Sequence, residues 1–181
     1  MSESLRWLAL GYSVPINPSK NRVYVWRKLK EYGAEYFKQG VALLPYSRNS
    51  YSKFKYLAAK IKEMDGEASI VEMKFIDPKD EQAMVAQFRS QAWEELSQLK
   101  KDCAAIMSQL SRQTVKHLTD SESEEIKKII KRFSKARDRS HFCLTLAEDV
   151  EHGLYSLIDL TKATMGDAAV QFVKAMDKAV K

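Results

Sequence analysis

Residues 11–33 read GYSVPINPSKNRVYVWRKLKEYG, and they predict the end of a β-strand, a stiff loop and a basic helix. The segment that leads into them, LRWLALGYS at 5–13, is apolar on both faces of an extended chain, which is typical of a central strand covered on one side or both. Asn17 is the expected helix N-cap, and Pro18 suits the first helical position. Gly33 stands where a left-handed C-terminal cap is expected.

This helix has five basic residues and no acid before Glu31. Three roles fit such a helix. It could grip an anion such as DNA phosphate, support a catalytic site at the strand end, or present an ordinary solvated face. A helical wheel places Lys20, Arg27 and Lys30 on one outward face, with Lys28 also outside the apolar arc. A cationic stripe of this kind favours phosphate contacts, which supply affinity and salt dependence but little base recognition.

Arg22 is the exception among the basic residues. The wheel places it inside the apolar arc, between Leu29 and Trp26, and an unpaired buried guanidinium is costly. Arg22 is therefore expected to reach a partner or the edge of the sheet. Two interpretations stay open: a small anion or DNA-backbone site near Tyr12, or a structural clamp on a loop carbonyl or an acid.

Further strands and one helix follow the basic helix. Residues 34–45 predict two short strands around Gln39-Gly40, closed by Pro45. Residues 47–66 predict a second amphipathic helix that ends at Gly66, and residues 67–76 a last strand. The order strand, helix, strand, strand, helix, strand is the signature of the ferredoxin-like βαββαβ unit. We therefore predict a ferredoxin-like basic domain at residues 1–76.

The second predicted helix adds basic residues mixed with tyrosines. Arg48 is the first of its cations, and we include it among the candidate DNA contacts. Basic residues with aromatic neighbours can bind single strands by stacking, but tyrosines at these positions more often pack against the fold. The tyrosines are Tyr46, Tyr51 and Tyr56.

Residues 77–181 change to a helical pattern, with Pro78 at a helix start. We expect three helices packed as an antiparallel bundle, so that the whole chain is α+β. Thr119 or Ser121 caps the second helix, and the third runs from about Phe142 to the C-terminus with Gly153 and Gly166 as soft points. The first helix carries an apolar stripe at 3.6-residue spacing: Met84, Phe88, Trp93, Leu96, Leu99, Cys103, Ile106, Met107 and Leu110.

The positive charge is concentrated in the first part of the chain. Residues 1–76 hold 13 Lys and Arg against 7 Asp and Glu, whereas residues 77–181 hold 17 of each. The formal net charge of +6 therefore belongs to the first domain, which suggests an anionic partner there. In the second domain, the basic run from Lys127 to Arg139 either extends the DNA-facing surface or balances neighbouring acids, and the neutrality of residues 77–181 favours balancing.

Composition and cysteine usage place the protein in a broad class. It is 45% hydrophobic and 30% charged, as in ordinary globular proteins. No apolar run approaches the ~20 residues of a membrane span, and the N-terminus does not have the pattern of a signal peptide. The two cysteines, Cys103 and Cys143, fit no paired metal or redox spacing, so we expect reduced thiols in the cytoplasm. No cofactor fingerprint, nucleophile elbow or metal-ligand spacing is present, and we expect no cofactor and no metal site.

Several short motifs follow one another along the first part of the chain: Tyr12-Ser13-Val14-Pro15, Pro18-Ser19, Arg22-Val23, Val25-Trp26-Arg27-Lys28-Leu29, Gly33-Ala34, Gly40-Val41-Ala42-Leu43-Leu44-Pro45 and Gly66-Glu67-Ala68. Together they resemble the N-terminal domain of the ChrB family of chromate-resistance regulators. The resemblance covers nearly the whole chain and is densest from Leu8 to Pro45. Larger members of that family continue into a second domain.

The resemblance implies a cytoplasmic transcription regulator that binds promoter DNA and responds to chromate or another oxyanion. We expect a homodimer, because symmetric binding to pseudo-palindromic DNA is the usual arrangement. The expected DNA contacts are Lys20, Arg22, Arg27, Lys28, Lys30 and Arg48.

Two other classes of function stay open. The layout of residues 1–76 is similar to the small ferredoxin-like CRISPR-associated nucleases, whose first strand ends in Tyr-Asp with the Asp as metal ligand. Here the pair is Tyr12-Ser13, and a neutral hydroxyl is no substitute for that carboxylate, so we expect no catalytic activity. A chromate-handling enzyme would lack a paired-cysteine redox centre. The remaining alternative is a structural or protein-interaction module whose long helices are the working surface.

Overall fold

The computed structural model describes residues 5–112, 118–162 and 166–180. Contacts divide the chain into two compact units, residues 1–88 and 89–181, and the boundary falls inside one long helix. The sequence predicts two domains, residues 1–76 and 77–181. Whether each of them folds independently is not decided by contacts, so this division stays a prediction. The first unit comprises β1 (Trp7–Ser13), α1 (Ser19–Tyr32), β2 (Glu35–Lys38), β3 (Val41–Pro45), α2 (Arg48–Glu63), β4 (Glu67–Met73) and the start of α3 (Pro78–Arg112).

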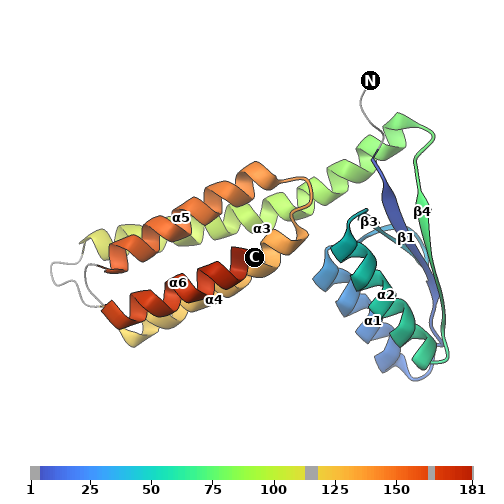
Figure 1. Cartoon of the computed structure of the whole chain (residues 1–181), viewed down its shortest axis with the longest axis horizontal. Helices are drawn as coiled ribbons and strands as arrows, with labels where there is room; N and C mark the ends of the chain where they lie inside the picture. The colour runs from blue at the N-terminus through green and yellow to red at the C-terminus, as the bar shows by residue number, and fades with distance from the viewer. Residues whose placement is uncertain (1–4, 113–117, 163–165, 181) are drawn as a thin grey trace. The chain divides into compact units, whose positions relative to one another are not determined.

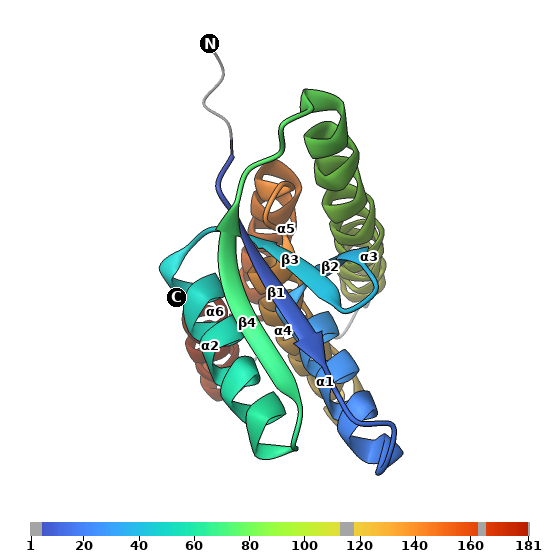
Figure 2. The ribbon, with the colours of Figure 1, turned by 90° about the vertical axis from the view of Figure 1, so that its right-hand side faces the viewer.

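The four strands form one antiparallel sheet in the order β2-β3-β1-β4 (Figure 2). β1 is central, with Leu10 paired to Ala42 of β3 on one side and to Ile70 of β4 on the other. This order and the sequence of elements confirm the predicted ferredoxin-like α+β fold. The central place of β1 explains why residues 7–10 are apolar on both faces, since both faces are buried.

Each face of the sheet has its own cover. α1 and α2 lie side by side on one side of the strands (Figure 1). On the other face the start of α3 packs against Trp7, whose ring lies 5.7 Å from the ring of Phe88. Trp7 also donates from Nε1 to Oε1 of Glu81 at 2.9 Å. The first turns of α3 therefore belong to the core of the sheet.

Two glycines allow close approaches at the end of β1. Gly40, in the β2–β3 turn, has φ of 74°, and its carbonyl accepts from the Tyr12 amide at 2.7 Å. A Cβ at Gly40 would lie 2.9 Å from the carbonyl oxygen of Tyr12. Gly66 precedes β4 and would place a Cβ 2.5 Å from the carbonyl oxygen of Ser13. The two neighbouring segments can thus contact the strand end only with glycine at these positions.

The second unit is a bundle formed by the rest of α3 with three further helices among the described residues. The prediction of one helix from Phe142 to the C-terminus is wrong, because two helices occupy this segment. Of the two glycines at which the sequence predicts a weak point, Gly166 is the residue where the second of these helices, α6, begins. The other, Gly153, lies within the first helix, α5. The further helices are α4 (Asp120–Arg139), α5 (Leu144–Lys162) and α6 (Gly166–Val180).

Helix α4 is anchored at its start by a capping box. Thr119 Oγ1 accepts from the Glu122 amide, and the Glu122 carboxylate accepts from the Thr119 amide at 2.8 Å. Thr119, rather than Ser121, is therefore the cap. Gln109 of α3 donates to the same carboxylate at 2.9 Å, so the buried Glu122 links the two helices.

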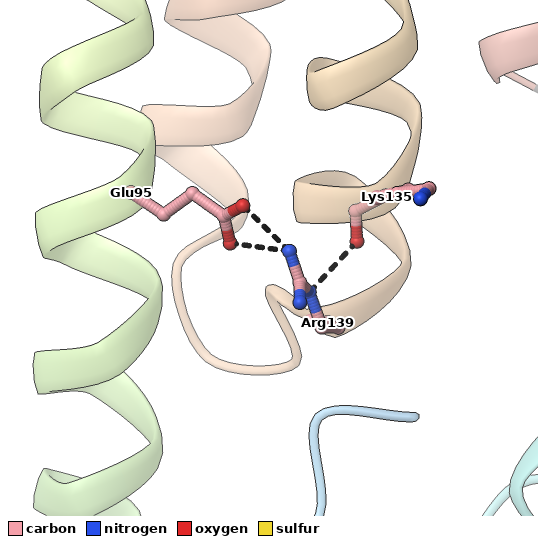
Figure 3. Close-up of polar contacts among 3 residues, drawn as sticks. All are labelled: Glu95, Lys135 and Arg139. Atoms are coloured by element: carbon pink, nitrogen blue, oxygen red, sulfur yellow. Dashed lines mark hydrogen bonds and ion pairs between the residues drawn. The ribbon is translucent and has the colours of Figure 1, made fainter. Parts of the chain in front are cut away.

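Ion pairs, most of them between helices, involve much of the basic run from Lys127 to Arg139. Arg139 of α4 donates to both carboxylate oxygens of Glu95 in α3 and to the carbonyl of Lys135 (Figure 3). Nη1 of Arg132 lies 2.7 Å from Oδ2 of Asp102 in α3. Arg137 pairs with Glu151 of α5, and Lys127 pairs with Glu124 within α4. These contacts support the interpretation that this run balances neighbouring acids.

We expect Glu95→Gln to lower the free energy of unfolding by about 1–2 kcal/mol, because the Arg139 guanidinium would lose its carboxylate partner in a partly buried place. The side chains of Arg139 and Glu95 are 23% and 33% exposed. Urea unfolding monitored by far-UV circular dichroism measures the change. The matched control is Glu124→Gln, which removes an exposed carboxylate paired with Lys127 and should have no measurable effect. Equal losses in the two variants would contradict the prediction.

Candidate nucleic-acid interface and the adjoining hollow

The buried face of α1 differs from the one that the helical wheel predicts. Val25, Leu29 and Tyr32 are buried, whereas Trp26 is 46% exposed and Arg22 is exposed. Arg22 therefore lies outside the apolar arc in which the helical wheel places it. The buried arc includes Tyr32, seven residues after Val25, so its centre is shifted away from Arg22 and Trp26. Tyr24 of the same helix forms a side-chain hydrogen bond with Tyr56 of α2, and this bond raises the pKa of Tyr24.

The ends of α1 are close to those predicted from the sequence. Gly33 adopts the left-handed conformation with φ of 68°, and its amide donates to the Lys30 carbonyl at 3.1 Å. This confirms the predicted C-cap. At the other end Pro18 is the N-cap residue in place of Asn17, and the helix begins at Ser19. The difference is a shift of one residue.

Three cations form an exposed stripe along α1. Lys20, Arg27 and Lys30 are all exposed, and none of the three makes an ion pair within the part of the chain that the structure describes. At 1.5 Å per residue the stripe is about 15 Å long. The Lys30 ammonium lies 4.7 Å from the centroid of the Trp26 ring. We refer to Lys20, Arg27 and Lys30 as the α1 stripe.

The other basic candidates have different surroundings. Lys28 is 28% exposed and lies 2.9 Å from a carboxylate oxygen of Glu31; this hydrogen bond is the main reason that its pKa is raised. Arg48 is exposed at the first turn of α2. Lys53, one turn further along α2, lies over the ring of Tyr32 at 5.8 Å. Arg48 is therefore near the C-terminal end of α1, whereas Lys20 and Arg22 lie in its first turn.

Arg22 lies at a surface hollow of about 1050 Å³ within the first unit. One wall is the first half of α1, and the opposite wall is the end of β1 with the β2–β3 hairpin. The strand end and Arg22, which are close in sequence, are thus also close in space. The lining residues are Tyr12, Ser13, Val14, Ile16, Ser19, Arg22, Val23, Trp26, Tyr36, Lys38, Gln39 and Gly40.

Two tyrosine hydroxyls meet in this hollow. Tyr12 donates to the hydroxyl oxygen of Tyr36 at 3.4 Å. Burial raises the pKa of Tyr12, and the hydrogen bond with Tyr36 raises it further, while the nearby charge of Arg22 acts in the opposite direction. Tyr12 is therefore a neutral hydroxyl at physiological pH, able to donate a hydrogen bond.

The tyrosines of α2 and its approach are more exposed than packing residues usually are. Tyr46, Tyr51 and Tyr56 are 41%, 45% and 49% exposed. Two of them have structural contacts nonetheless: the Arg6 guanidinium lies 3.9 Å from the centroid of the Tyr46 ring, and Tyr56 bonds Tyr24. The structure thus gives these two a packing role, while Tyr51 presents its ring to solvent.

Neither cysteine has the surroundings of a reactive thiol. Cys103 is buried in the bundle core, and burial raises its pKa to about 11. Burial also raises the pKa of Cys143. Both are free thiols, protonated at neutral pH. Across residues 5–112, 118–162 and 166–180, no group of three His, Cys, Asp or Glu side chains is placed to hold a metal ion. Nor does any helix of these segments combine the length and apolar character of a membrane span.

The fold and the surface define the class of protein: an α+β protein with a ferredoxin-like unit, a cationic first helix and a helical bundle. The sequence of the chain identifies the family, because the model of the family described as "Protein ChrB, N-terminal" matches residues 22–175. The chain belongs to this family and is thus related to the chromate-resistance regulators. The match begins at Arg22, so Lys20 and the Tyr12-Ser13 pair precede it. No curated protein and no solved structure gave a significant match.

Proposed function

We propose that the protein is a non-catalytic, DNA-binding transcription regulator of chromate resistance that acts in the cytoplasm. The observation that carries the proposal is the α1 stripe. Its three cations are exposed together on a regular helix and make no ion pair within the described residues; the charge of Lys30 only partly offsets the rise in the pKa of Glu35 that burial causes. In the bundle, the three arginines of α4 pair with acids of neighbouring helices, whereas Lys128 and Lys131 of the same helix are exposed and make no ion pair within the described residues.

The geometry of the stripe suits a nucleic-acid backbone. Duplex DNA carries one negative charge per about 1.7 Å of its axis, so a stripe about 15 Å long can face several phosphates at once. The helix fixes the spacing of the cations, which lowers the entropy lost on binding. Contacts of this kind position a protein on DNA and do not read its sequence. Base recognition would need further groups, and Arg48 is a candidate for one end of the surface.

The partners and the assembly are also proposals. A homodimer would place two α1 stripes on the two halves of a pseudo-palindromic promoter site. Chromate or another oxyanion is the proposed effector, as the family relationship suggests. We propose, because of Ser13, that the protein is not a catalyst. This residue lines the hollow and stands where the similar nucleases carry an aspartate.

The test is Arg27→Ala combined with Lys30→Ala. We expect the double variant to bind the DNA upstream of its own operon about tenfold more weakly at ~0.1 M salt. Removing two phosphate contacts should also reduce the slope of log K against log salt by about 1.8, since each contact contributes about 0.9. Electrophoretic shifts or fluorescence anisotropy over a salt series, with and without chromate, provide both quantities.

Lys128→Ala combined with Lys131→Ala is the matched control. It removes the same charge from two exposed lysines of α4 that make no ion pair within the described residues. This variant should keep nearly the wild-type affinity and salt slope. Equal effects of the two double variants would show that only net charge matters and would overturn the assignment of the stripe. Wild-type protein without a salt-dependent shift, but with a stable protein partner, would favour the interaction-module alternative.

A further inference from the structure

The hollow beside α1 has the charge of an anion-binding site. Arg22 of α1 and Lys38 of β2 both line it, and no acidic residue is among its lining residues. Neither cation makes an ion pair within the described residues. The hydroxyls of Tyr12 and Tyr36 converge there, 3.4 Å apart. Cations without carboxylates, together with hydroxyl donors, form a set of groups that binds phosphate or carboxylate oxygens.

Size and lining indicate that the anion is part of a larger molecule. The volume of about 1050 Å³ is at the upper end of the range for organic-ligand pockets, far above what a small oxyanion fills. Trp26 and Tyr36, 46% and 41% exposed, offer aromatic rings to this space. Val23 adds an aliphatic surface. Exposed aromatic rings beside cations are the groups that hold a planar base by stacking while its phosphate is neutralised.

We propose that this hollow binds a nucleoside monophosphate, with the base against Trp26 and Tyr36 and the phosphate between Arg22 and Lys38. The nucleotide could be free in solution or an unpaired nucleotide of DNA, and the chemistry of recognition is the same in both cases. Arg22 is thereby assigned to the hollow, whereas the residues of the α1 stripe do not line it, although Lys30 lies over the ring of Trp26. Binding in the hollow does not require that the stripe bind duplex DNA.

Isothermal titration calorimetry of the full chain with deoxyadenosine monophosphate tests the proposal. We expect this nucleotide to bind at least tenfold more tightly than either deoxyadenosine or inorganic phosphate, because only the nucleotide uses both the rings and the cations. No binding at millimolar nucleotide would overturn the proposal. So would phosphate or chromate alone binding as tightly as the nucleotide, since the rings would then contribute nothing.

Two variants locate the site. Arg22→Gln and Trp26→Leu each change an exposed side chain, so both should fold normally, which far-UV circular dichroism checks. Each should weaken nucleotide binding about tenfold. Lys55→Gln removes one exposed positive charge from α2, outside the hollow, and should bind as the wild type does. Wild-type affinity in Arg22→Gln, or an equal loss in Lys55→Gln, would overturn the assignment.

A DNA hairpin with one unpaired adenine, compared with the fully paired hairpin, identifies the source of the nucleotide. Tighter binding of the first hairpin that is lost in Arg22→Gln assigns the hollow to a nucleotide of DNA. Equal binding of the two hairpins, together with Arg22-dependent binding of the free nucleotide, assigns it to a free effector. If the free nucleotide and the unpaired adenine both fail to depend on Arg22, the proposal is wrong, whatever the α1 stripe does with duplex DNA.

Discussion

Trp7→Ala is expected to lower the free energy of unfolding of the first unit by about 3–5 kcal/mol, the largest effect of any single substitution proposed for this chain. Trp7 has no exposed surface. It stands at the start of the central strand, where the sheet meets the first turns of α3. Its removal would leave a cavity that the regular strand cannot close, because neighbouring strands hold the backbone of β1 on both sides.

The contacts of Trp7 explain the size of this effect. Its ring packs edge-on against Phe75 at 5.7 Å and in a tilted arrangement against Phe88 at the same distance. The hydrogen bond from Nε1 to Glu81 would be lost as well. Aromatic pairs of this geometry contribute beyond their buried area. The substitution thus removes apolar burial, ring contacts and a hydrogen bond in one step.

Trp93→Ala is the matched control for Trp7→Ala. Trp93 is 61% exposed on α3, so its removal should change the free energy of unfolding by no more than about 0.5 kcal/mol. Urea unfolding followed by far-UV circular dichroism measures both variants. Losses of similar size would show that Trp7 does not hold the sheet and α3 together.

Gly66→Ala is the second large effect, with an expected loss of about 1–3 kcal/mol. The added Cβ would lie 2.5 Å from the carbonyl oxygen of Ser13 and 2.8 Å from Cγ2 of Ile61. The first of these atoms is backbone at the end of the central strand, and Ile61 is fully buried, so neither can move away easily. The amide of Gly66 also donates to the Ile61 carbonyl at 3.0 Å, which fixes the chain after α2.

Gly153→Ala provides the opposite result as a control. Gly153 lies inside α5, and a Cβ there meets no atom within 4 Å. Alanine should stabilise the bundle by about 0.5–1 kcal/mol, because it restricts the unfolded chain and favours the helix. Thermal unfolding of the Gly66→Ala and Gly153→Ala proteins measures both changes in stability. A stable Gly66→Ala protein would contradict the close approach of the loop to β1.

Most of the elements in the first unit could be predicted from local sequence. The apolar run at 7–10, the turn at Gln39-Gly40 and the cap at Gly33 each depend on neighbours within a few residues, so the pattern alone indicates them. The second unit was predicted less well. The separation between α5 and α6 is weakly marked, because Gly153 and Gly166 are equivalent signals in the sequence and only packing distinguishes them.

Part of the candidate site, the α1 stripe, was predicted from the sequence, whereas the exposure of Arg22 was not. Exposed cations at helical spacing are visible in the sequence, so the stripe of Lys20, Arg27 and Lys30 could be anticipated. One of the two interpretations of Arg22 placed it near Tyr12, where the structure has it, but the wheel was wrong to put Arg22 and Trp26 in the buried arc. In the structure Tyr32 joins Val25 and Leu29 in that arc, and Arg22 and Trp26 line the hollow.

The sequence by itself determined the class of fold, the excess positive charge of residues 1–76, the helix with its cationic stripe and the relationship to the ChrB family. These properties depend on residue order, on charge and on short-range periodicity. Tertiary structure alone decided which face of α1 is buried, that Trp7 joins the sheet to α3, and that Arg22 and Lys38 line one hollow. Such features arise from contacts between segments distant in sequence, whose free energies depend on packing that no local pattern records.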